Sequence, residues 1–315
     1  MKKSLIALAV LGLSGAAMAQ SSVTLYGVAD AGLGKIKTNP PATDANNKTQ
    51  FISSSLMNNG NSRIGLRGIE DLGGGASAGF QFETGINLND GSSAQSGPGL
   101  WSRAAKMWLS GNWGTFQMGR TLNPTFLAAA AWELTGMANY TIANVYSTGP
   151  GGSRTSSQFS YKTPDVLGGL TAELAYVFKS DNSNKARWDL NVIYKNGPIV
   201  ASLGANKNKG DKTTYVLGGR YSFSNFNVAA SYTRTTNALA LKRQGFTIGG
   251  SAVFGAASVT LDLSRDSKNE WSGGKKYTNG MLEGKYALSK RTFLYAAYLR
   301  LDDNNNYGIG VRHNF

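Results

Sequence analysis

The C-terminal segment of the chain alternates strictly between apolar and polar positions. Its apolar positions are Tyr307, Ile309, Val311, His313 and Phe315, and the positions between them are Gly308, Gly310, Arg312 and Asn314. A period of two residues indicates a β-strand with two different faces. The same period recurs along nearly the whole chain, and the second face is consistently polar. We therefore expect the apolar face of these strands to contact lipid rather than a protein core.

Three further segments show the alternation clearly. Their apolar-face residues are Leu170, Ala172, Leu174, Tyr176 and Phe178 in the first, Trp188, Leu190, Val192 and Tyr194 in the second, and Phe293, Tyr295, Ala297, Leu299 and Leu301 in the third. Such segments number about sixteen, and each approaches the ten or so residues that a tilted membrane-spanning strand needs. A closed barrel of about sixteen strands is too wide for side chains to fill, so it leaves an aqueous channel. The pattern predicts an all-β fold, a sixteen-stranded antiparallel transmembrane β-barrel.

One connection differs from the short turns and polar loops elsewhere. Residues 121–153, here called the long loop, show no alternation, and loops of this length usually carry function. The long loop contains one carboxylate, Glu133, and no lysine or arginine. Pro124 precedes a stretch that can form a short helix. Because the loop is too apolar for a solvated surface, we expect it to fold against the inner wall of the barrel and to narrow the channel.

Two segments next to the long loop depart from clean alternation. In residues 102–110, Lys106 and Trp108 share a face, whereas residues 115–120 place Arg120 on the same face as Phe116 and Met118. A wall that contacts another protein chain need not alternate apolar and polar residues. We interpret these segments as a sign of a subunit interface.

The N-terminus has the pattern of an export signal. Lys2 and Lys3 precede an apolar stretch, and residues 17–19 read Ala-Met-Ala, which matches a small-x-small cleavage site. The predicted division is a signal peptide, 1–19, and a barrel domain, 20–315. Without the two lysines, 30 basic residues face 18 acidic residues, a formal charge of +12. No later run reaches the roughly 18 apolar residues that a transmembrane helix needs, so spanning requires a closed barrel.

The residue inventory argues against several other functions. The chain has no cysteine and one histidine, His313, so it offers neither thiol chemistry nor a cluster of transition-metal ligands. The position of that histidine on the terminal strand does not suggest a Ser-His-acid arrangement. The basic residues are scattered rather than clustered, which is unlike a nucleic-acid-binding surface. We expect no catalytic residues, no metal site and no cofactor.

Five motifs carry a resemblance to a known family. They are Ser-Val-Thr-Leu-Tyr-Gly-Val-Ala-Asp at 22–30, Ser-Arg-Ile-Gly-Leu-Arg-Gly at 62–68, Glu-Asp-Leu-Gly at 70–73, Gly-Arg at 119–120 and the terminal Phe315. In order and spacing the chain resembles the trimeric general porins of Gram-negative bacteria, in particular those of β-proteobacteria. The resemblance covers the whole chain after the predicted signal peptide. It implies a homotrimer in the outer membrane, in contact with lipid and lipopolysaccharide.

The resemblance also implies the residues of a pore constriction. In this family the third long loop folds inward, and wall arginines face carboxylates of that loop across the narrowest point. The motifs carry this role to Arg63, Arg103, Arg120 and Arg154, with Arg67 as a further pore-lining residue. Glu133 is the one candidate partner in the loop. Phe315 resembles the family's recognition signal for the barrel-assembly machinery.

The expected function is passive diffusion of small hydrophilic solutes and ions. A neck with several arginines and one glutamate would favour anions, because charged rings select ions by sign and low-dielectric walls focus the field. Strand parity supports an inward position for Arg63, Arg67 and Arg154, but it does not support one for Arg103 or Arg120. Two alternatives stay open: a channel selective for one class of anionic substrate, and a structural or adhesive outer-membrane barrel.

Overall fold

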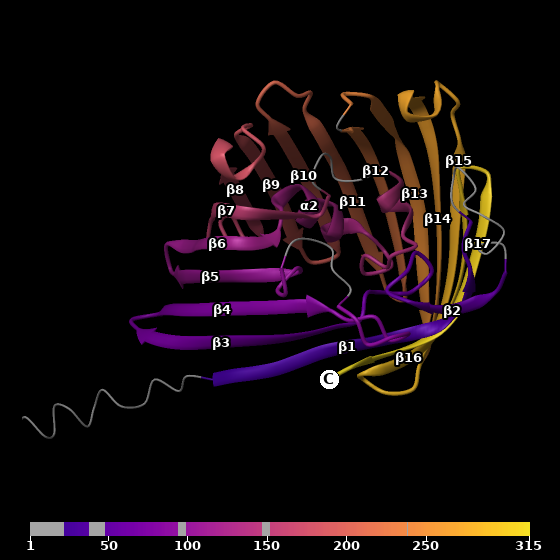
Figure 1. The fold of residues 1–315 in the computed structure, drawn as a ribbon, viewed down its shortest axis with the longest axis horizontal. Coiled ribbons are helices and arrows are strands. Elements are labelled where there is room, and N and C mark those ends of the chain that lie inside the picture. The colour runs from indigo at the N-terminus through magenta and orange to yellow at the C-terminus, as the bar shows by residue number, and fades with distance from the viewer. Residues whose placement is uncertain (1–21, 38–47, 94–98, 147–151, 238) are drawn as a thin grey trace, which may run out of the picture.

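A computed structural model describes residues 22–37, 48–93, 99–146, 152–237 and 239–315. The described strands form one antiparallel sheet that closes on itself, with β17 paired to β1 (Figure 1). None of the described helices is both long and apolar enough to cross a membrane. The predicted signal peptide, 1–19, lies outside the described residues.

Most of the described residues are in strands, and four short helices lie in the described parts of the connections. The strands are β1 (Ser22–Lys35), β2 (Gln50–Ser53), β3 (Arg63–Gly73), β4 (Ala76–Gly85), β5 (Ala104–Gly111), β6 (Gly114–Leu122), β7 (Arg154–Lys162), β8 (Leu170–Val177), β9 (Arg187–Asn196), β10 (Ile199–Asn208), β11 (Thr214–Phe223), β12 (Phe226–Thr236), β13 (Lys242–Phe254), β14 (Ala257–Asn269), β15 (Thr278–Ala287), β16 (Thr292–Leu301) and β17 (Asn304–Asn314). The helices are α2 (Pro124–Trp132), η2 (Ile142–Tyr146), η3 (Lys179–Asp181) and η4 (Glu270–Ser272).

Seventeen strands occupy sixteen positions in the wall. One edge of β1 pairs with β17, and its other edge pairs first with β3 and then with β2. β2 and β3 are therefore two parts of one wall position, separated by residues 54–62, which we call the inserted segment. Every other strand pairs with its neighbours in sequence. The predicted sixteen-stranded antiparallel barrel is confirmed.

The two faces of the wall differ as the alternation predicts. On β9, Trp188 is 53% exposed on the outside, whereas the neighbouring Asp189 is 2% exposed on the inside. On β17, Ile309 and Val311 are exposed and Gly308 is buried. The prediction for the terminal strand is confirmed, and the outer face is the apolar one.

The prediction for β16 is wrong. We expected the face with Tyr295, Ala297 and Leu299 to be the lipid face, but these three side chains are buried inside, while Leu294 and Tyr298 are exposed outside. Both faces of β16 are apolar, so alternation alone cannot tell them apart. The inner face is apolar because a hydrophobic cluster covers it.

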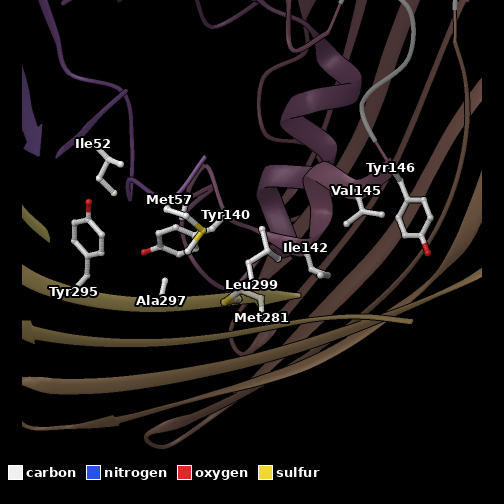
Figure 2. Close-up of a cluster of buried hydrophobic side chains, with 11 residues drawn as sticks. Ile52, Met57, Tyr140, Ile142, Val145, Tyr146, Met281, Tyr295, Ala297 and Leu299 are labelled. Carbon is white, nitrogen blue, oxygen red and sulfur yellow. The ribbon is translucent and has the colours of Figure 1, made fainter. Parts of the chain in front are cut away.

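That cluster lies inside the barrel and joins three parts of the chain (Figure 2). Its larger members come from the wall, the inserted segment and the long loop: Ile52, Met57, Tyr140, Ile142, Val145, Tyr146, Met281, Tyr295 and Leu299. A cluster of this kind would be unexpected in a lumen filled only with water. It gives the long loop a fixed seat on the wall.

The two segments expected to be irregular do alternate. On β5, Met107 and Leu109 are exposed outside, and on β6 Phe116 and Met118 share that outer face. Trp108, the apolar residue that obscured the pattern, belongs to the inner face with Lys106. The wall therefore presents a regular apolar surface here too.

Candidate pore lining

The barrel encloses an open cavity of about 650 Å³ beside the long loop. Its charged lining consists of five basic side chains and one carboxylate: Arg63, Arg103, Lys106, Arg154, Arg312 and Glu83. These residues come from β3, β4, β5, β7, β17 and the segment before β5. The four arginines, here called the arginine cluster, lie on the wall, and the long loop forms the opposite side.

Glu83 holds two members of the arginine cluster. Arg103 Nε lies 2.7 Å from one carboxylate oxygen, and Arg63 Nε lies 3.5 Å from the other. The phenol of Tyr26 also donates to Glu83, at 3.0 Å. Because ion pairs fix the long arginine side chains, their orientation toward the cavity is set before any solute arrives.

Backbone and amide groups orient the other two arginines. Arg154 Nε donates to the carbonyl oxygen of Arg103 at 2.8 Å. One terminal nitrogen of Arg312 donates to Asn59 Oδ1 at 2.8 Å, and its Nε donates to Asn314 Oδ1 at 3.2 Å. Neutral acceptors leave the full positive charge of these side chains available to the cavity.

The long loop places α2 against the inner face of β9, β10 and β11 (Figure 1). Asn123 caps the helix by accepting a hydrogen bond from the Phe126 amide, and Pro124 follows as its first residue. Asp189 on β9 accepts hydrogen bonds from the Thr125 amide and hydroxyl, at 2.8 and 2.6 Å. A carboxylate at a helix N-terminus is favourable because of the helix dipole.

Glycines in the wall allow the helix to approach closely. A Cβ at Gly218 on β11 would meet the Trp132 indole, and one at Gly204 on β10 would meet Ala128. Ser202 on β10 donates to the Ala128 carbonyl at 2.7 Å. Small residues at these positions of the wall therefore allow the helix to pack closely against its inner face.

The Glu133 carboxylate is used within the long loop. Glu133 is 3% exposed, and its oxygens accept from the Thr135 amide and hydroxyl, the Thr141 hydroxyl and the Met137 amide, at 2.6 to 2.9 Å. These bonds close the turn after α2. Glu133 is absent from the cavity lining, so it does not face the arginines as expected.

The inserted segment also folds into the barrel. Buried Asp30 on β1 accepts from the Asn58 side chain at 3.0 Å, the Gly60 amide at 2.8 Å and the Tyr295 phenol at 2.7 Å. These bonds hold the segment against the wall and bring Asn59 to the cavity. The second narrowing element was not anticipated from the sequence.

Asn59 connects the arginine cluster with the long loop. Its amide nitrogen donates to the Tyr140 phenol oxygen at 2.9 Å, and that phenol donates to Glu283 Oε2 at 2.6 Å. Burial raises the pKa of the Tyr140 phenol, and the Glu283 carboxylate raises it further. The phenol therefore remains a neutral donor to the Glu283 carboxylate.

The structure brings three of the predicted arginines together and separates two. Arg63, Arg103 and Arg154 line the cavity. Arg120 is not in this lining: its strand partner is Ala105, and it donates to the Ser102 carbonyl and the Ser156 hydroxyl. Arg67 lies outside the lining as well, with its guanidinium 5.5 Å from the centre of the Tyr26 ring.

Sequence reasoning missed Glu83, Lys106 and Arg312 as lining residues. The alternation along β4 could have identified Glu83. Phe80 and Phe82 alternate there with Gln81 and Glu83, and β4 follows the strand of Arg63 after a short turn. Parity also places Arg312 on the polar face of the terminal strand. The partner of the arginines is thus a wall carboxylate, not one in the loop.

The comparisons with known proteins agree with this architecture. Residues 4–306 match the family model of Gram-negative porins. The chain is 34% identical to outer membrane porin protein 32 of Delftia acidovorans, over 99% of this chain and 93% of the relative. It is 32% identical to an outer membrane porin protein of Bordetella pertussis, over the full length of both.

Solved structures show the same fold. An anion-selective porin from Comamonas acidovorans superimposes with a TM-score of 0.75 at 25% identity, covering 94% of this chain and all of that chain. These relatives are channels of the outer membrane and not enzymes. The chain belongs to the family of Gram-negative porins and forms an outer-membrane channel.

Proposed function

We propose that this porin is a general diffusion channel that prefers anions. The observation that carries the proposal is the lining of the cavity, where five basic side chains meet a single carboxylate. A structural neighbour is described as anion-selective, which supports the same direction. The formal charge of the whole sequence, +14, has the matching sign.

The mechanism is passive. A small hydrophilic solute enters the barrel, passes between the arginine cluster and the long loop, and leaves on the other side without an energy source or cofactor. The constriction is formed by Arg63, Arg103, Arg154 and Arg312 on the wall, and by the long loop and the inserted segment on the other sides. The low-dielectric wall focuses the field of the arginines, so an anion meets a lower barrier than a cation.

The test is the reversal potential of the purified protein in a planar bilayer under a KCl gradient. We expect Arg63, Arg103 and Arg154, replaced together by alanine, to shift the potential toward cation preference. The matched control replaces three exposed arginines, Arg265, Arg291 and Arg300, by alanine and removes the same charge outside the cavity. An unchanged potential in the first variant, or an equal shift in both, would contradict the assignment.

The dependence of current on solute concentration distinguishes a general anion channel from a channel selective for one anionic substrate. A general channel gives a current that rises in proportion to salt. A channel selective for one anionic substrate saturates with that substrate at low concentration. We infer the general channel. The cavity is open, and among its described lining residues the side opposite the arginines carries no charged residue that would hold one solute from both sides.

We infer a homotrimer, as the family resemblance implies. A porin of the same fold, OmpT of Vibrio cholerae, is described in a trimer form. The outer faces of β5 and β6 alternate as regularly as the rest of the wall, so the irregularity that suggested a subunit contact there gives no reason to prefer these strands. The outer face beyond the subunit contact would contact lipid and lipopolysaccharide. The test is the mass of the purified protein on native gels, where we expect three chains per particle and where a single chain would contradict the proposal.

We also infer that residues 1–19 direct export and that Phe315 is read by the barrel-assembly machinery. Phe315 is 48% exposed, and its backbone pairs with Gly27 on β1. A Cβ on Gly27 would meet the Phe315 ring, so the wall leaves room for this aromatic side chain. Deleting Phe315 should lower the amount of barrel in outer-membrane fractions, whereas Asn305→Ala, at the opposite end of β17, should not.

A further inference from the structure

Helix α2 is apolar on every side, including the side that faces water. Pro124, Thr125, Ala128, Ala131 and Trp132 are buried. Phe126 and Leu127 are partly exposed and line the cavity. A helix with one face in water usually carries polar side chains on that face. Phe126 and Leu127 depart from this rule on the side of the helix that a passing solute meets.

The apolar surface continues beyond the helix. Met137 and Ala143, from the later part of the long loop, line the same side of the cavity, together with the uncharged polar residues Asn139 and Asn144. Among the described residues of the loop, none contributes a charged side chain to this lining, because Glu133 is turned into the loop. The cavity therefore has one basic side and one uncharged side that is mainly apolar.

A contiguous apolar patch bordered by polar groups is the kind of surface that marks a ligand-binding groove. Its occupant must also satisfy the arginine cluster. Carboxylates suit arginine because the guanidinium presents parallel N–H donors to both oxygens. Inorganic anions such as chloride use only the basic side and leave the apolar side in contact with water.

We propose, on the basis of the anion preference inferred above, that the channel favours small organic monoanions with an apolar body. Short-chain and aromatic monocarboxylates are the solute class. Their carboxylate lies against the arginine cluster, and their hydrocarbon part lies against Phe126, Leu127 and Met137. Binding is weak and transient, since conduction requires that the solute also leaves.

The experiment compares sodium benzoate, sodium acetate and benzylammonium chloride on the full-length protein in planar bilayers. We expect benzoate to reduce the chloride current at concentrations where acetate has little effect. Benzylammonium, which has the same ring and the opposite charge, should not reduce the current. Equal effects of benzoate and acetate on the wild-type channel would overturn the proposal, as would block by benzylammonium as strong as block by benzoate.

Two variants test the surface itself. Leu127→Gln keeps a good helix former but replaces the apolar surface, and it should raise the benzoate concentration for half-block several-fold. Leu239→Gln is the matched control, because Leu239 is 78% exposed and does not line the cavity. Met137→Gln, which lies outside the helix, repeats the test if Leu127→Gln does not assemble. Unchanged half-block in Met137→Gln and Leu127→Gln would contradict the assignment.

The inference and the proposed function fail separately. The KCl reversal potential of the wild-type channel tests anion preference without any organic solute. Anion preference with equal benzoate and acetate block would leave the proposed function standing and remove this inference. A channel without anion preference would remove both.

Discussion

Glu83 is the residue on which the charge of the cavity depends most. It is the only carboxylate among the charged lining residues described, and it pairs with both Arg63 and Arg103. A wall carboxylate in this position reduces the positive potential and also keeps two arginine side chains in place. Its two roles have opposite effects on anion preference, so its replacement is informative.

We predict that Glu83→Gln strengthens anion preference. Glutamine keeps the hydrogen-bonding shape but removes one negative charge, and a unit charge about 7 Å away in water is worth about 0.6 kcal/mol. The energies of the anion and the cation change by this amount in opposite directions, so the anion-to-cation permeability ratio should rise about sevenfold, measured by reversal potential in KCl. Glu70→Gln, at an exposed position on β3, is the matched control. A fall in the ratio would mean that the loss of arginine positioning by Glu83 outweighs the loss of its negative charge.

The position of single residues was predictable where strands are regular. Arg63 lies at the end of a strand whose alternation is regular, and it lines the cavity. Arg154 lines the cavity too, but the register of β7 is irregular between Thr155 and Gln158, so alternation does not account for its position. Arg103 precedes β5, so strand alternation does not apply to it, and only the family resemblance suggested its place in the lining. Glu133 could not be placed, because the turn that uses its carboxylate depends on Thr135 and Thr141 folding back on it.

At the scale of elements, the seat of α2 depends on small residues in the wall. Trp132 occupies the space above Gly218, where a Cβ would collide with its ring. At Gly219, the next residue of β11, a Cβ would meet the Val200 carbonyl oxygen at 3.3 Å, which is a close contact but not a collision. Gly219→Ala is therefore a matched control for Gly218→Ala.

We predict that Gly218→Ala loosens the long loop and Gly219→Ala does not. Overpacking of this kind costs about 1–3 kcal/mol, and the loop can relieve it by moving off the wall. The expected result for Gly218→Ala is a higher and noisier single-channel conductance with the barrel still assembled. Equal conductance in the two variants would show that the wall, rather than the loop, sets the size of the pore.

The inserted segment is a second element with an influence on the pore. Asn59 accepts from Arg312 and donates to Tyr140, so it joins the wall arginine to the long loop. We predict that Asn59→Ala lowers anion preference, because Arg312 is no longer held toward the cavity. The double variant with Arg312→Ala should shift the reversal potential no further than Arg312→Ala alone. Additive shifts would show that the two residues act independently.

Elements were predictable from alternation as long as their two faces differed. β17 and β9 follow the expected pattern, whereas β16 does not, because its inner face packs against Tyr140 and Ile142 of the long loop. The inserted segment was invisible in the sequence for a related reason. Its burial comes from Asp30 and Tyr295, which are distant in sequence and meet it only after the barrel closes.

At the scale of the whole molecule, two sources of positive charge act on a passing ion. The arginine cluster lies in the cavity, and other basic residues lie outside its lining, in a sequence whose formal charge is +14. The salt concentration distinguishes these two sources of charge. The screening length is about 10 Å at 0.1 M and about 3 Å at 1 M, so distant charges lose their effect first.

We predict that anion preference weakens with salt but does not vanish. The permeability ratio should fall as KCl is raised from about 0.1 to about 1 M, where only charges within about 3 Å of the ion's path still act. The remaining preference belongs to the arginine cluster, so the triple alanine variant of Arg63, Arg103 and Arg154 should lose it. The variant of Arg265, Arg291 and Arg300 should instead lose part of the preference seen at low salt. A ratio that reaches unity at 1 M in the wild-type channel would mean that the global charge of the barrel, and not its constriction, selects the ion.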